Sequence, residues 1–181
     1  MEKILRQARR QGWLFLALTS LLTFAACNQN KAADDNNGDE VSGQIRTENM
    51  QEVQAYLKSC GAFFIATVDG DQPRVRPFGV SEIIDGRLYI MTGKSKDVYK
   101  QMSKNGKFEI CAIRPGASEW MRVSGTLVND ETQSVKEELL NRHEELKMMY
   151  KADDENMAIL YITHATARFY SFNATERKIS F

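Results

Sequence analysis

From residue 62 onward, apolar residues fall in short runs that are typical of β-strands. Residues 62–68, 73–84 and 87–92 are three such runs, and Asp-Gly pairs at 69–70 and 85–86 separate them. An Asp-Gly pair between two strand-like runs favours a tight hairpin. This order predicts an antiparallel meander at the start of the folded part.

The same pattern continues to the end of the chain. Further strands are predicted at 107–113, 119–128, 157–163 and 165–172, and the apolar residues Ile179 and Phe181 finish the chain. Helical spacing of apolar residues or helix-start signals predict helices at 47–59, from Ser95 onward and at 131–149. Six or seven strands in hairpin order with two or three helices favour an antiparallel barrel or sandwich, as a single domain at about 45–181.

The amino terminus has a different composition. Residues 1–26 combine a basic start with an apolar run that is shorter than the ~20 residues of a membrane-spanning helix, which is typical of a signal peptide. Phe24-Ala25-Ala26-Cys27 resembles a bacterial lipobox, so Cys27 is the predicted lipidation site. Residues 27–44 are polar and predict a flexible tether. We expect an extracytoplasmic protein anchored by lipid to a membrane of the bacterial envelope; an ordinary signal peptide or an uncleaved anchor is the alternative.

Composition narrows the chemistry. The formal net charge is zero, which gives no indication of a nucleic-acid partner. His143 and His164 are the only histidines and lack metal-site spacing, and the common hydrolase motifs are missing. Any chemistry is therefore expected to come from a cofactor. Cys60 and Cys111 adjoin apolar runs, which favours unpaired core residues, although an extracytoplasmic protein could also join them in a disulfide.

Basic residues mark a candidate anion site. Arg74 and Arg76 share one face of the predicted strand, where their guanidinium groups suit a phosphate or carboxylate; a solvated strand face is the alternative. Ser95 is a candidate N-cap, and Lys96 stands beside it at a predicted helix start, whose backbone N–H groups favour anions; a solvated helix end is the alternative.

Four segments in order, Pro73–Gly79, Leu88–Thr92, Lys94–Lys96 and Trp120–Gly125, resemble the pyridoxamine 5′-phosphate oxidase-like family. The resemblance covers about residues 48–181. It implies a mainly β (α+β) fold, namely a six-stranded antiparallel split β-barrel with two or three flanking helices. It also implies a homodimer that holds FMN at its interface.

The resemblance assigns roles to particular positions. Arg76 would contact the FMN phosphate, Thr92 would lie beside the phosphate and ribityl chain, and Ser95 with Lys96 would grip the phosphate. Trp120 would contact the flavin. Further candidates are Arg74 and Arg122, for phosphate, ring edge or substrate, and Pro77, where a missing N–H suits close approach of the ring.

The sequence also departs from the family. Ser81 stands where classical oxidases carry a lysine, and residues 171–181 do not match their carboxy-terminal segment with tryptophan and arginine. Pyridoxamine phosphate oxidation is therefore not expected. We expect an FMN-dependent oxidoreductase of unknown substrate. A non-catalytic flavin- or haem-binding module, a structural barrel and a deazaflavin cofactor all stay open.

Overall fold

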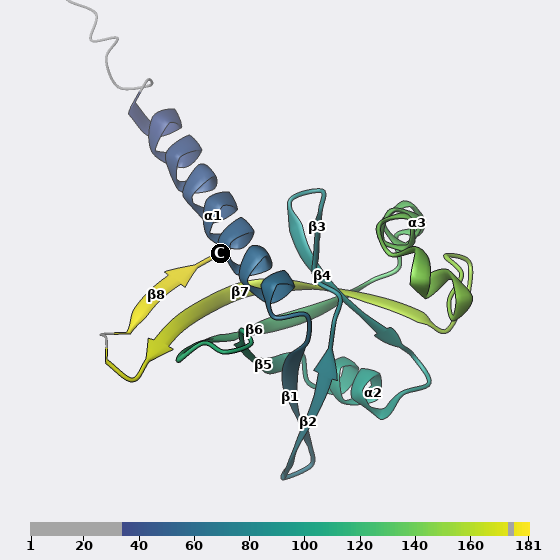
Figure 1. The fold of residues 1–181 in the computed structure, drawn as a ribbon. Coiled ribbons are helices and arrows are strands. Elements are labelled where there is room, and N and C mark those ends of the chain that lie inside the picture. Colours follow the sequence, from purple (N-terminus) through teal and green to yellow (C-terminus); the bar gives the residue numbers. More distant parts are fainter. Residues whose placement is uncertain (1–33, 174–175) are drawn as a thin grey trace, which may run out of the picture.

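The computed structural model describes residues 34–173 and 176–181. In chain order its elements are α1 (Asp34–Ser59), β1 (Phe63–Asp69), β2 (Gln72–Phe78), β3 (Glu82–Ile84), β4 (Arg87–Gly93), α2 (Asp97–Lys104), β5 (Lys107–Ile113), β6 (Glu119–Asp130), α3 (Gln133–Arg142), the 3₁₀ helix η1 (Glu144–Met148), β7 (Met157–Ser171) and β8 (Arg177–Ser180) (Figure 1). The predicted signal peptide at 1–26 and the lipidated Cys27 lie outside the described residues. Within them, no helix is both long and apolar enough to cross a bilayer.

The strands form one antiparallel sheet in the order β2-β1-β5-β6-β7-β4-β3, with β8 beside β7. The predicted class, a mainly antiparallel β fold with flanking helices, is confirmed, and the open sheet fits a split barrel. The sheet has eight strands instead of six. One reason is that the predicted strand 73–84 divides: β2 pairs with β1, whereas β3 pairs with β4.

The two predicted strands 157–163 and 165–172 are a single strand, β7. Between them His164 has a φ of 50°, and the register with β6 shifts between Ser124 and Thr126. A β-bulge accommodates an irregular residue without ending the strand. The long β7 can therefore pair with β6 along most of its length and also with β4 and β8.

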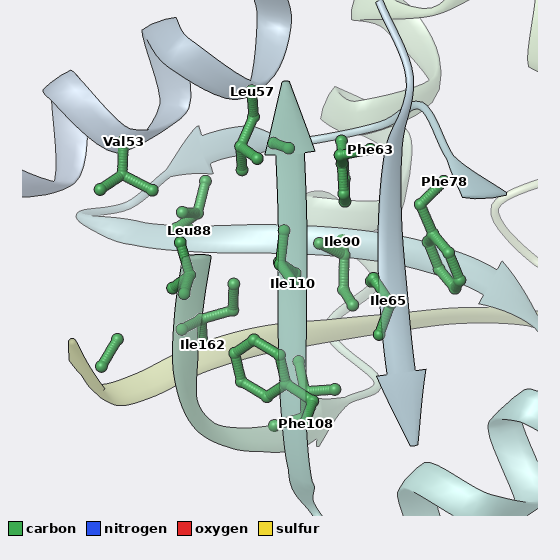
Figure 2. Packing of buried hydrophobic residues seen from close by; sticks show 14 of the residues in the cluster. Val53, Leu57, Phe63, Ile65, Phe78, Leu88, Ile90, Phe108, Ile110 and Ile162 are labelled. Carbon is green, nitrogen blue, oxygen red and sulfur yellow. The ribbon is translucent and has the colours of Figure 1, made fainter. Parts of the chain in front are cut away.

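Two hydrophobic clusters lie on opposite faces of β4. Leu88 and Ile90 belong to the larger cluster, which Val53 and Leu57 of α1 cover together with β1 and β5 (Figure 2). The intervening Tyr89 and Met91 belong to a smaller cluster with α3 and β7. Because both faces of β4 are buried, its sequence is a continuous apolar run instead of an alternating one.

Helix α1 begins at Asp34, whereas the apolar spacing predicted a start at Thr47. Residues 39–48 are exposed, and Figure 1 shows this end projecting away from the sheet. Residues 34–44, which were expected to form part of a flexible tether, are thus helical. Local contacts support this part, since Gln44 Nε2 donates to Glu48 Oε1 at 3.1 Å.

Both described cysteines are free, as predicted. Cys60 is buried at the end of α1, but Cys111 is exposed, so its predicted place in the core is wrong. Strand β5 alternates, with Ile110 and Ala112 facing inward, which turns Cys111 to the outer face of the sheet.

Candidate functional site

A cleft of about 220 Å³ opens where the end of β2, the end of β4, the start of α2 and the η1 segment meet. Its lining residues are Arg76, Pro77, Phe78, Gly79, Val80, Met91, Thr92, Lys96, Val98, Leu146, Met149 and Tyr150. Four of the predicted site residues, Arg76, Pro77, Thr92 and Lys96, are therefore brought together. Arg76 and Lys96 supply the positive charge, and most of the remaining lining is apolar.

The turn between β4 and α2 sets the position of Lys96. The Lys96 N–H donates to the Gly93 carbonyl at 3.1 Å, and Asn156 accepts the N–H groups of Lys94 at 2.7 Å and Ser95 at 2.9 Å. A Cβ on Gly93 would lie 3.1 Å from the Tyr150 hydroxyl oxygen. Glycine therefore allows the segment between η1 and β7, which contains Tyr150 and Asn156, to pack tightly against this turn.

Helix α2 starts at the cleft with Lys96 as its N-cap residue and no side-chain cap. The predicted N-cap, Ser95, is wrong by one position, because the bond from the Lys96 N–H to the Gly93 carbonyl closes a turn before the helix and leaves Ser95 inside that turn. Tyr99 and Lys100 donate back to the Lys96 carbonyl at 3.0 and 3.4 Å. Among the described residues, no acceptor is found for the earlier N–H groups of the first turn, which carry the positive end of the helix dipole.

Arg76 reaches the cleft from β2 in a fixed orientation. Its Nη1 donates to Thr67 Oγ1 at 2.5 Å and to the Arg74 carbonyl at 3.1 Å, and its Nη2 donates to Gln101 Oε1 at 2.6 Å. Burial lowers the pKa of Arg76, and repulsion from Arg74 lowers it further, whereas Asp69 and Asp97 oppose these effects. No carboxylate lies within 4 Å of this guanidinium among the described residues, so its charge is open to an anion.

The other predicted residues do not line the cleft. Ser95 is exposed at its border, and Arg74 pairs with Asp69 at 3.5 Å. Trp120 stacks on Tyr170 with ring centroids 5.4 Å apart, and Arg122 pairs with Glu109 on the outer face of the sheet. Within one chain, the cleft and the Trp120–Arg122 pair are thus separate.

Residues 48–181 match the family described as "Pyridoxamine 5'-phosphate oxidase like". The chain belongs to this family. A search among curated proteins finds no match.

Solved structures of the pyridoxamine 5′-phosphate oxidase-like fold agree with this membership. A NimC/NimA family protein from Clostridium acetobutylicum is 37% identical, with a TM-score of 0.74, and the match covers 78% of this chain and 98% of that chain. General Stress Protein 26 from Bacillus anthracis has a TM-score of 0.54 at 15% identity, covering 73% and 99%. A heme binding protein from Mycobacterium smegmatis has a TM-score of 0.55 at 11% identity, covering 72% and 57%. These last two show the shared fold alone.

Several residues that line the cleft or support Arg76 in this pyridoxamine 5′-phosphate oxidase-like chain were not predicted. Thr67 and Gln101 are buried beneath Arg76, and their role depends on a contact between β1 and α2 that no local pattern indicates. Met149 and Tyr150 follow η1, which the sequence predicted as a continuous helix. Ser81, at the position of the family lysine, is buried and does not line the cleft.

Proposed function

We propose that the cleft binds FMN and that the protein is a flavin-dependent oxidoreductase. The observation that carries this proposal is the division of the cleft into a cationic end and an apolar remainder. A phosphate group with close to two negative charges fits Arg76, Lys96 and the open N–H groups of α2. The apolar remainder suits a flat ring system beside Pro77 and Gly79.

Bound FMN would supply hydride or electron transfer to the reaction. The chain would hold the phosphate through Arg76 and Lys96 and exclude water from the ring through Met91, Leu146 and Met149. No carboxylate or imidazole is present among the described residues that line the cleft. The protein's part would therefore be binding, orientation and shielding of the flavin, and the substrate would be a small molecule or an electron-transfer partner.

A homodimer would complete this site. The cleft of one chain is smaller than the roughly 300–1,000 Å³ of small-molecule sites. Phe64, Val75 and Ile113 are large apolar residues that are 47%, 65% and 50% exposed. They lie on one sheet face. Phe64 is paired with Cys111, and Ile113, two residues after Cys111, faces the same way. Val75 is paired with Ala66, which is two residues after Phe64 and shares its face. This outer sheet face also carries Trp120 and Arg122, which a second copy could bring to the flavin.

A haem-binding module is the second candidate. A heme binding protein shares the fold, and the cleft presents Met91, Met149 and Tyr150, whose sulfur and oxygen atoms are groups that can ligate haem iron. The first experiment separates the two candidates. The full chain is purified in detergent, and the bound cofactor is released and identified by absorbance and mass spectrometry. We expect FMN; a haem spectrum, or no cofactor after reconstitution with FMN, would contradict the proposal.

Reduction of the bound flavin separates an enzyme from a carrier. An oxidoreductase is expected to be reduced by a nicotinamide or another donor and reoxidised by an acceptor, both followed by flavin absorbance. A flavin that no donor reduces would favour a storage or delivery module instead.

The Arg76→Ala, Lys96→Ala double variant tests the phosphate end. We expect the Kd for FMN to rise at least ~100-fold, because two charge-assisted contacts are lost. The matched control is Arg46→Ala, Lys107→Ala, which removes the same charge from two exposed positions. Full FMN occupancy in the first variant would show that the phosphate binds elsewhere.

We also propose that Cys27 carries a lipid that anchors the protein in the bacterial envelope, outside the cytoplasm. The lipobox-like sequence before Cys27 supports this proposal. In detergent phase separation of lysates from bacteria that express the protein, the wild type should enter the detergent phase, whereas Cys27→Ser should stay in the aqueous phase. Equal partitioning of the two proteins would contradict a lipid on Cys27.

A further inference from the structure

Arg76 is supported from inside the protein by two buried neutral side chains. Thr67 is 2% exposed and Gln101 is 8% exposed. Gln101 Oε1 accepts both Arg76 Nη2 at 2.6 Å and the Thr67 hydroxyl at 2.7 Å, while Thr67 Oγ1 accepts Arg76 Nη1 at 2.5 Å. Two donors face the same amide atom of Gln101, which identifies that atom as the oxygen. The three side chains form a closed triangle of hydrogen bonds.

The neutrality of this support is unusual for a partly buried arginine. Buried charges are normally paired with an opposite charge, and a carboxylate would hold a guanidinium more strongly than an amide does. A carboxylate at position 101 would also cancel the charge of Arg76 and repel an incoming phosphate. The neutral acceptors fix the guanidinium without forming an ion pair with it, so that of the described carboxylates only Asp69 and Asp97, both beyond 4 Å, act on its charge.

The geometry leaves donors free for a ligand. A guanidinium has five N–H groups, and the bonds to Thr67, Gln101 and the Arg74 carbonyl use three of them. Gln101 also belongs to α2, whose N-terminus opens into the same cleft. One helix thus contributes its dipole to the anion site and positions the arginine on the neighbouring strand.

We infer that Thr67 and Gln101 are positioning residues that make the cleft selective for the phosphorylated flavin, FMN, over unphosphorylated riboflavin. This inference rests on the proposed function and deepens it. The selectivity arises because the support beneath Arg76 is rigid but uncharged, so the ligand's phosphate can form the close ion pair that the described residues do not provide.

The Gln101→Glu variant tests this inference, because it keeps the hydrogen-bond acceptors beneath Arg76 but makes them negatively charged. It therefore shows whether the neutrality of the support matters, or only its hydrogen bonds. Glutamate keeps the size and both acceptor contacts of glutamine, so a purely structural role predicts unchanged or tighter FMN binding. A neutral support predicts that the ratio of the riboflavin Kd to the FMN Kd falls at least ~10-fold, because the phosphate contact loses its charge assistance. Titration of the full chain, stripped of flavin, with each compound gives the two Kd values.

Two further variants keep the test decisive. Gln51→Glu makes the same charge change at an exposed position of α1 and should leave the ratio unchanged. Gln101→Met removes the acceptor without adding charge; FMN should bind more weakly while a preference over riboflavin remains. The Gln101→Met variant replaces Gln101→Glu if circular dichroism shows that the glutamate variant is unfolded. Unchanged FMN affinity of Gln101→Met would overturn the positioning role of Gln101.

The outcomes distinguish the inference from its basis. A Gln101→Glu protein that keeps the wild-type ratio overturns the inference and leaves the proposed FMN site standing. A wild-type chain that binds neither flavin overturns the proposed function, and the inference falls with it.

Discussion

At the scale of single residues, Glu131 shows how strongly ionic contacts can shift a surface group. Burial alone would raise its pKa, but hydrogen bonds from Lys136, Lys94 and Asn129 lower it to about 2. Lys136 is itself buried and lies 2.7 Å from the carboxylate. Because the folded-state pKa lies below the unfolded value of 4.5, the stabilisation is complete above about pH 4.5 and is lost as the pH falls toward 2.

Glu131→Gln should therefore lower the free energy of unfolding at pH 7, and the difference from wild type should shrink at pH 3. The expected loss is about 1 kcal/mol at pH 7, since the carboxylate is about half exposed and partly screened. Urea unfolding at both pH values measures it. Glu144→Gln, which removes a solvent-exposed pair with Lys147, is the control and should change stability by less. An equal difference at both pH values would contradict this account.

Individual site residues could be predicted from the sequence where a single local pattern was enough to place them at the site. Arg76 and Lys96 followed from a strand face and a helix start, and both line the cleft. Ser95 was misplaced as the N-cap because a turn from Gly93 to Lys96 precedes the helix and moves its start by one residue. Thr67 and Gln101 acquire their role only when β1 packs beside α2, which the sequence does not encode locally.

At the scale of elements, Gly125 shows why one position in β6 must lack a side chain. A Cβ there would lie 2.9 Å from the Thr163 carbonyl oxygen and 3.1 Å from Ala165 Cα, both backbone atoms of β7. The register between the two strands shifts at this point, and regular pairing resumes on both sides, which holds the two backbones close together.

Gly125→Ala should lower the free energy of unfolding by ~1–3 kcal/mol, because the strands must separate to admit the methyl group. Gly43→Ala is the matched control, since a Cβ at this exposed helical position meets nothing within 4 Å. The control should keep or slightly raise stability, as alanine is the better helix former. Chemical denaturation compares the two; an unaffected Gly125→Ala protein would show that β7 adjusts freely.

The strands predicted at 62–68 and 87–92 match β1 and β4 closely, because Asp-Gly pairs act within a few residues of the strands they connect. The segment between the two pairs was predicted as one strand but divides into β2 and β3. The helix expected at 131–149 was wrong in its continuity. It ends at Arg142, and His143 leaves helical geometry to place Nε2 2.9 Å from the buried Glu82. That carboxylate also accepts Lys58 and Arg142, so a contact between distant elements overrides the local helical pattern.

At the scale of the whole molecule, the outer sheet face tests the proposed homodimer. Phe64→Lys with Val75→Lys places two charges on this face without touching the core. We expect the wild type to be a dimer and the variant a monomer with weaker FMN binding, as analytical ultracentrifugation and flavin titration would show. Met148→Lys, at an 88% exposed position on η1, is the control and should remain dimeric. A monomeric wild type that binds FMN fully would contradict a shared site.

The contacts between the carboxy-terminal half of α1 and the end of the chain bear on the order in which parts of the protein unfold. Asn49 Nδ2 donates to the Ser180 carbonyl at 2.8 Å, and Arg177 of β8 pairs with Glu52. Phe181 is bonded to Ala165 through both its N–H and its carbonyl. The carboxy-terminal half of α1 and the end of the chain are therefore held together, although they lie far apart in the sequence. Local unfolding of one segment removes hydrogen-bond and ion-pair partners of the other. Amide hydrogen exchange should therefore show similar protection for residues 49–57 and 177–181. A pulling force applied at the amino-terminal end of α1 would be transmitted to β8 before the other strands.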